Sequence, residues 1–391
     1  MATDRIAKPK KAPQKNNALL IEIGIVLAIA LLMVLILPLM ISGFRLGLIG
    51  RFLSLGIVAL GIDLIWGFTG LLSLGHGIFF ALGGYGFAMY LQLSSIDPGQ
   101  LPEFFTLYGV TELPWFWHPF SSFPFTLAAV VLIPSIVAGV LGYLVFRNRI
   151  RGVYFSILTQ AALVVFFNFF NGQQKLINGT NGLKTDTALL FGNQVGSSEM
   201  QFVFYILSVV FLVLIYTLCR WLTSGRFGRM LIAIRDDENR VRFSGYDPTG
   251  FKVLVFAVSG AIAGIAGALY TVQSGIVSPQ FMDIAFSIEM VIWVAVGGRA
   301  TLVGAILGAV LVNLARSLLS EKFPEVWLFF QGALFLLVVT ALPNGIIGWL
   351  RYDAKDQLRS LSGRPQAVTT YPSLELDPNI QQEQQTLVDK K

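Results

Sequence analysis

Two acidic residues, Asp63 and Glu289, lie inside long apolar stretches of the sequence. A carboxylate in the interior of a bilayer costs about 2.5–3.5 kcal/mol on insertion scales, so each should face protein or a water-filled cavity. In such a cavity the carboxylate could accept N–H hydrogen bonds from a polar solute. The alternative is a structural role, with Arg299 or a backbone amide as the partner, or a position near the membrane interface.

Three further polar residues have spacing or surroundings that suit contact with a solute. Ser73 and His76 lie in a Gly-rich stretch, where a broken helix would offer free backbone amides and carbonyls to a ligand. The glycines could equally serve close packing of helices. Asn181 lies in a polar, Asn-rich stretch, where it could meet a solute or a delivery protein, or act as a turn residue.

The segment 225–240 joins two apolar stretches and combines Gly225 and Gly228 with a short apolar run and then Asp236-Asp237-Glu238. The apolar run is too short to cross a bilayer. It could instead dock in a groove of a partner protein, with apolar anchors giving affinity and charges giving register. The alternative is a helix lying on the bilayer surface, against which the three acidic residues argue.

Several kinds of chemistry lack the residues that they need. The sequence has no Gly-Lys pair, so it has no P-loop to hold the phosphates of ATP. With two histidines and one cysteine, Cys219, it has no cluster suited to a metal or a catalytic site. We therefore expect no enzyme activity, no metal, no cofactor and no nucleic-acid binding, and any ATP hydrolysis must come from another protein.

The composition shows which elements must position these residues. The chain of 391 residues is 55% hydrophobic and 13% charged, with a mean hydropathy of +0.70. Soluble domains carry about 25% charged residues, so the deficit indicates a lipid environment. We predict an all-α polytopic transmembrane helix bundle of about ten spans, each needing roughly 20 apolar residues.

The third and eighth of these spans are Gly-rich or short, so either could be a broken or re-entrant helix. The predicted spans are 18–41, 46–66, 69–92, 123–146, 152–170, 201–222, 251–274, 286–298, 300–319 and 327–349.

The basic residues predict the orientation. With a cytoplasmic N-terminus, 22 of the 28 Lys and Arg residues fall in cytoplasmic segments, with Arg45 and Arg51 among the exceptions. Both termini are then cytoplasmic. The predicted domains are a basic tail (1–17), a transmembrane permease domain (18–350) with a cytoplasmic loop at about 223–250, and a flexible tail (351–391).

Several motifs together resemble the branched-chain amino-acid and urea permease family of ATP-binding-cassette importers. One is Gly228-Arg229 followed by Ala233-Ile234-Arg235-Asp236. The resemblance covers about residues 46–350 and includes the segments 67–77, 83–85, 179–183, 257–270 and 296–298.

The resemblance implies a multi-pass permease subunit in the inner (plasma) membrane. Its partners would be a second homologous permease, two cytoplasmic ATPase subunits and an extracytoplasmic solute-binding protein. The loop would dock in a cleft of the ATPase, and this coupling role is carried over to matching residues: Gly225, Arg229, Ala233, Arg235 and Glu238.

Within the family, the segments 59–67, 287–299 and 323–327 look more like urea permeases, and the amino-acid branch usually has Asn where this chain has Asp63. The resemblance therefore predicts urea as the solute, with branched-chain amino acids as the alternative. Two other classes rank below: a self-contained secondary transporter or channel with Asp63 and Glu289 as ion ligands, and a polytopic membrane enzyme.

Overall fold

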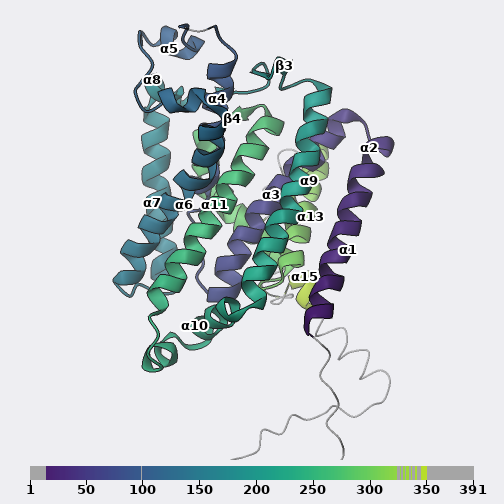
Figure 1. The fold of residues 1–391 in the computed structure, drawn as a ribbon, viewed down its shortest axis with the longest axis vertical. Coiled ribbons are helices and arrows are strands. Elements are labelled where there is room, and N and C mark those ends of the chain that lie inside the picture. Colours follow the sequence, from purple (N-terminus) through teal and green to yellow (C-terminus); the bar gives the residue numbers. More distant parts are fainter. Residues whose placement is uncertain are drawn as a thin grey trace, which may run out of the picture. The chain divides into compact units, whose positions relative to one another are not determined.

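The computed structural model describes residues 15–97, 99–323 and separate positions from 326 to 349 (Figure 1). The tail 351–391, most of the tail 1–17 and most of the predicted span 327–349 lie outside the described residues. A short helix, α15 (Gly345–Gly348), falls within that last span.

The described part is a bundle of helices with four two-residue strands, which confirms the predicted all-α membrane fold. Its longer helices are α1 (Lys15–Leu35), α3 (Gly43–Thr69), α4 (His76–Ser94), α6 (Phe123–Arg147), α7 (Val153–Gly172), α9 (Ser198–Ser224), α10 (Arg226–Phe243), α11 (Pro248–Ser274), α12 (Ile284–Gly297) and α13 (Leu302–Lys322).

Among the described residues, seven helical stretches are long and apolar enough to cross a membrane. They are Glu22–Met40 (α1 continued by α2, Leu37–Met40), α3, α6, α7, α9, α11 and α13. The predicted eighth span, 286–298, corresponds to α12, whose 14 residues reach only about 21 Å. This is short of a bilayer core of about 30 Å, in line with the expectation of a short element.

The centre of the bundle is formed by α3 and α11. Of the most apolar window of α3, 83% is buried inside the protein, and α11 contacts α3, α4, α6 and α9. Glycines permit this close packing: a Cβ on Gly264 would collide with the carbonyl oxygen of Val130 on α6, and one on Gly267 with that of Phe80 on α4. The backbones therefore meet directly, as in tightly packed membrane helices.

The Gly-rich third span is interrupted, as the sequence suggested. Gly70 ends α3 in the left-handed conformation (φ +75°), and the next helix begins only at His76. The intervening backbone is held by α7: the Ser156 hydroxyl donates to the carbonyl of Leu72 (2.6 Å), and the amide of Leu74 donates to the Thr159 hydroxyl (3.1 Å). Non-helical backbone within a membrane bundle is stable only with such partners.

The two ends of the bundle carry different elements (Figure 1). One end has the long connections, with α5 (Glu103–Leu107), η1 (His118–Ser121), α8 (Gln174–Ile177), η2 (Gly179–Asn181) and η3 (Pro279–Met282). There β1 (Leu183–Lys184) pairs antiparallel with β4 (Ile276–Val277), and β2 (Leu189–Leu190) with β3 (Asn193–Gln194). The other end has α10. The loop that contains α10 and the long connections therefore lie at opposite ends, and which end faces the cytoplasm stays a prediction.

Cysteine labelling tests that sidedness. Cys219 is the one cysteine of the sequence, so a Cys219→Ala background has no thiol and is silent towards thiol reagents. In it, Gln194→Cys on β3 should react with a membrane-impermeant maleimide in right-side-out spheroplasts. Ser244→Cys, just beyond α10, should react only after permeabilisation, because both positions are exposed at opposite ends. The reverse pattern would contradict the predicted orientation.

Candidate functional site

Helix α10 is amphipathic and lies across the end of the bundle, against α3, α9 and α11. Gly225 precedes it with an extended backbone (φ −85°, ψ −164°) and separates it from α9. Residues at helical spacing turn inward and are buried or half-buried: Phe227, Leu231, Ile234 and Val241. Residues on the opposite face are exposed: Arg229, Ala233, Asp236 and Arg240. One face is therefore used in the fold and the other is open.

A kink at Asp237 divides α10 into two pieces. The backbone of Asp237 is extended (φ −157°, ψ 98°), and its carboxylate accepts hydrogen bonds from the amides of Asn239 (2.9 Å) and Arg240 (3.2 Å). Asp237 thus caps the second piece in the way that acidic residues cap helix N-termini. The Arg240 guanidinium also pairs with this carboxylate at 3.2 Å.

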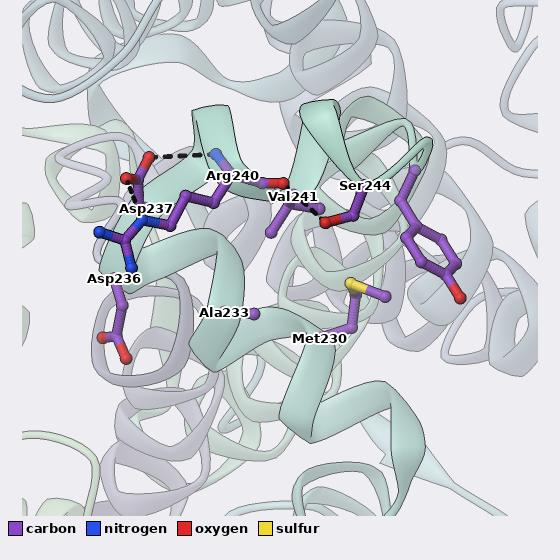
Figure 2. Close-up of a pocket in the computed structure, with 8 residues that line it drawn as sticks. Met230, Ala233, Asp236, Asp237, Arg240, Val241 and Ser244 are labelled. Carbon is purple, nitrogen blue, oxygen red and sulfur yellow. Dashed lines mark hydrogen bonds and ion pairs between the residues drawn. The ribbon is translucent and has the colours of Figure 1, made fainter.

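The kink leaves a groove of about 530 Å³ between the two pieces (Figure 2). In Figure 2, Met230 and Ala233 lie on the first piece, while Val241 and Ser244 face them from the second. The lining residues are Met230, Ala233, Asp236, Asp237, Arg240, Val241, Ser244 and Tyr246. An apolar floor with a charged rim is the form that suits docking of a protein segment.

Glu238 fixes the inner face of the second piece. Its carboxylate pairs with Arg242 of α10 (2.9 Å), with Arg151 of the α6–α7 connection (3.2 Å) and with Lys252 in the first turn of α11 (3.1 Å). The Lys252 side chain is only 1% exposed, and its ammonium lies 4.8 Å from the centre of the Phe146 ring. Three elements therefore meet at one carboxylate.

Electrostatics keep Glu238 ionised. Burial raises its pKa, but the charges of Lys252, Arg242 and Arg151 outweigh that effect, so the pKa lies below its ordinary value. A depressed folded-state pKa means that these ion pairs stabilise the fold above the unfolded-state pKa. Their contribution is lost only as the pH falls through the lower, folded-state value.

Arg235 anchors the first piece of α10 to α3. Its guanidinium donates to the carbonyl of Gly67 in the last turn of α3 (2.9 Å) and pairs with Asp236 (3.2 Å). Its aliphatic stem packs against Gly70, where a Cβ would approach it to 3.1 Å. The last carbonyls of a helix lack intrahelical partners and attract cations, which explains this contact.

Asp63 is fully buried in α3, where it contacts another part of the protein. Its carboxylate accepts a 2.7 Å hydrogen bond from the amide of Ala300, in the α12–α13 connection. Ala300 has a positive φ (60°), and the neighbouring Arg299 guanidinium lies 5.3 Å from the centre of the Trp66 ring. Asp63 therefore holds this connection against α3.

His76 and Ser73 are also buried. The His76 ring lies edge-on to Phe79 and Phe256, and its Nε2 is 2.7 Å from the Ser259 hydroxyl, which donates to the carbonyl of Gly61. The single hydroxyl proton of Ser259 is used there, so Nε2 is the donor to Ser259. Ser73 accepts from the amide of Gly75 (3.3 Å).

The remaining two candidates lie elsewhere. Asn181 is exposed on η2 and donates to the Tyr108 hydroxyl (3.3 Å), while Glu289 of α12 pairs with Arg316 of α13 (2.6 Å). The partner of Glu289 is thus Arg316, whereas Arg299 lies near Asp63. The five solute-path candidates do not form one cluster, and their solute contacts stay predictions. No group of three His, Cys, Asp or Glu suited to a metal occurs among the described residues.

Sequence reasoning missed Arg151, Arg242 and Arg316 as partners. Arg242 had a local signal, because it follows Glu238 by four residues and such pairs share a helix face. Arg151 comes from the α6–α7 connection and Arg316 from the helix after α12, and neither has a spacing that signals its partner.

Comparison with known proteins gives a consistent family. A family model described as "Branched-chain amino acid transport system / permease component" matches residues 44–339. The permease proteins LivM of the high-affinity branched-chain amino acid transport systems of Salmonella typhimurium and Escherichia coli K12 are 29% and 27% identical. Each match covers 76% of this chain and 69% of the relative. Permease protein LivH of E. coli K12 is 26% identical, over 75% of this chain and 90% of the relative. No solved structure matches.

The Glu238 cluster makes a prediction about stability. Glu238→Gln leaves the Lys252 ammonium buried without an anion, so we expect a loss of roughly 3–5 kcal/mol in the free energy of unfolding. Adding Lys252→Met should restore most of it, because no uncompensated buried charge then remains. Reversible SDS unfolding in mixed micelles measures both. Asp236→Asn, at an exposed position, should stay within about 0.5 kcal/mol of wild type. Equal losses in the single and double variants would contradict the assignment.

Proposed function

The chain belongs to the family of branched-chain amino-acid permease components of ATP-binding-cassette transporters, and we propose that it imports branched-chain amino acids using ATP hydrolysed by a separate subunit. The members of this family are transport components without catalytic activity of their own. The observation that carries the mechanistic part of the proposal is α10: one face is tied into the bundle, and the other holds an open groove.

The coupling residues predicted from the sequence fall into two groups. Arg229 and Ala233 lie on the exposed face of α10, where a partner could contact them. Arg235 and Glu238 face the bundle and tie α10 to α3, α11 and the α6–α7 connection. We assign docking to the first pair and transmission to the second. Gly225, at the junction with α9, allows α10 to turn across the end of the bundle.

The partners follow from the missing P-loop and from the relatives. Two cytoplasmic ATPase subunits would supply the energy, and a solute-binding protein would deliver the solute to the opposite end. The chain resembles both LivM and LivH of the same organism, each named as a permease protein of a high-affinity system. This supports a second homologous permease as partner.

The protein is a multi-pass protein of the inner membrane, as its permease relatives and apolar helices indicate. The basic residues support cytoplasmic termini. In the proposed organisation, the permease domain 18–350 lies between two cytoplasmic tails.

The proposed solute, a branched-chain amino acid, differs from urea, which the sequence motifs predict. The motifs around Asp63 and Glu289 resemble urea permeases, but the relatives described above are named for branched-chain amino acids. Asp63 also bonds to the amide of Ala300 through one carboxylate oxygen, which gives this buried residue a structural partner, while its other oxygen has none among the described residues. Urea specificity is therefore the second candidate.

Blocking the groove tests the docking role. Ala233→Trp places a large ring in the groove of α10, so we expect the ATPase to be lost on co-purification and uptake to fall at least about tenfold. Membrane insertion should not change, because Ala233 is exposed. The control is Asn193→Trp, which adds the same bulk on the exposed β3 hairpin at the opposite end. Normal ATPase association in Ala233→Trp would refute docking at this groove.

Uptake and competition separate the two solutes. In a strain lacking the native transport systems for both solutes, cells that carry the complete transporter should take up labelled leucine. Unlabelled isoleucine and valine should compete, and excess urea should not. Uptake of labelled urea that leucine leaves unchanged would replace the proposed solute by urea.

A further inference from the structure

A second cavity, of about 410 Å³, lies at the end of the bundle opposite α10. It opens between the first turns of α3, the end of α11, the beginning of α12 and the last turns of α13, beside η3. Its size falls within the range of small-molecule pockets, roughly 300–1,000 Å³. Under the orientation inferred from the basic residues, this is the end at which a solute arrives.

Charged residues of both signs line this cavity: Arg51, Asp283, Glu289 and Arg316. They come from α3, the start of α12 and α13, so the fold collects them from distant parts of the chain. Charges in a membrane protein are costly and are normally matched to one another or to a ligand. Whether these charges are matched to one another or to a ligand depends on how many of their hydrogen-bonding groups already have partners within the protein.

Several hydrogen-bonding groups of the cavity have no partner among the described residues. Arg51 donates through Nε to the carbonyl of Gln273 (2.8 Å), and no described residue accepts from its two terminal nitrogens. In the Glu289–Arg316 pair, one bond of 2.6 Å joins Oε2 to Nη1, and no described residue bonds to the other carboxylate oxygen. Asn313 is 4% exposed; its amide nitrogen donates to the carbonyl of Ala309, and no described residue donates to its Oδ1.

The rest of the lining is apolar or aromatic, with Phe52, Leu55, Phe281 and Phe286 among its residues. Phe281 and Phe286 lie with ring centres 5.5 Å apart. A site that combines free guanidinium donors, a free carboxylate oxygen and an apolar wall matches a molecule with a carboxylate, an ammonium and a hydrocarbon side chain. A neutral solute such as urea could hydrogen-bond to the charged groups, but it brings no formal charge to pair with them and no hydrocarbon to pack against the wall.

We propose that this cavity binds an amino acid zwitterion. Arg51 and Arg316 hold its carboxylate, Glu289 and Asn313 accept from its ammonium, and the aromatic wall takes its aliphatic side chain. The assignment rests on the proposed function, since it concerns the solute of that transport, and it adds the site and the residues that recognise the solute.

Binding of chosen analogues to the assembled transporter tests the chemistry. The complex of permeases and ATPases in lipid nanodiscs, without a binding protein, is titrated with leucine, leucinamide, N-acetyl-leucine and urea. Leucine should bind. Leucinamide lacks the carboxylate and N-acetyl-leucine lacks the ammonium, so each should bind at least about tenfold more weakly, the effect of losing one charge-assisted bond. Urea should not bind. Equal affinity for leucine and leucinamide, or no binding of leucine, overturns the proposal.

Two variants locate the binding. Arg51→Ala removes a guanidinium that pairs with no carboxylate in the described part of the chain, and it should raise the dissociation constant for leucine about tenfold or more. Arg45→Ala, on the exposed first turn of the same helix and outside the cavity, should leave it unchanged. The paired exchange Glu289→Arg with Arg316→Glu keeps an ion pair but exchanges its charges between α12 and α13. It should abolish leucine binding while the complex stays assembled.

The outcomes distinguish the two proposals. One outcome is that the intact transporter takes up leucine in cells while Arg51→Ala and the paired exchange at Glu289 and Arg316 bind leucine like wild type. In that case the cavity assignment is wrong and the transport function stands. If the intact transporter takes up no leucine, the proposed solute is wrong, and the cavity assignment falls with it.

Discussion

The ion pairs of Glu238 with Lys252, Arg242 and Arg151 determine where α10 can lie. Each charge that leaves water for a buried site costs several kcal/mol, and only close pairing offsets the cost. Lys252 is almost fully buried, so it cannot turn to water if the pair breaks. Rotation of the second piece of α10 would therefore separate Lys252 of α11 and Arg151 of the α6–α7 connection from their carboxylate partner. A helix held in this way moves together with its supports, which is the property that a mechanical coupling element requires.

The first piece of α10 connects to the opposite end through a different set of contacts. Arg235 bonds to Gly67 at the end of α3, and one turn earlier Asp63 of the same helix bonds to Ala300. Ala300 lies just beyond α12, and the first half of α12 carries Glu289, which lines the cavity. Helix α3 therefore contacts Arg235 of α10 near its last turn and lines the solute cavity with Arg51 nearer its beginning. Displacement of α10 by a partner would act on the cavity through α3 and the rigid length of α12.

Much of this fold could be predicted from the sequence, because membrane spans depend on local composition. Apolar length located the helices, the glycines around residue 70 located the break before His76, and the segment 225–240 was recognised as a helix outside the bundle. A backbone amide was among the expected partners of Asp63, but which amide it is, and the pairing of Glu289 with Arg316, could not be predicted. Ala300 is 237 residues from Asp63 and Arg316 is 27 from Glu289, so these contacts depend on which helices pack together. Hydropathy is nearly the same for every apolar helix and does not specify that packing. The kink at Asp237 was missed because the segment has no Pro, the commonest local signal for a break.

The surroundings of Asp63 and Glu289 explain why the first carboxylate stabilises the fold and the second is assigned to the solute. Asp63 is fully buried and accepts from the amide of Ala300 through one oxygen; its other oxygen is also buried and has no hydrogen-bond partner among the described residues, so the carboxylate is closed off from solute in this structure. Glu289 is likewise paired through one oxygen, but it lines a cavity, beside a second guanidinium and a buried amide oxygen that have bonding capacity left. Leaving that capacity unused in a membrane bundle costs free energy, and the cost is smallest towards the end of the bundle, near the membrane interface. A zwitterion brings a carboxylate and an ammonium, which can pair with the guanidinium nitrogens and the carboxylate oxygen that the fold leaves without partners. Urea carries neither an ammonium nor a carboxylate, whereas the zwitterion carries both, and the arrangement of this cavity therefore favours the amino acid.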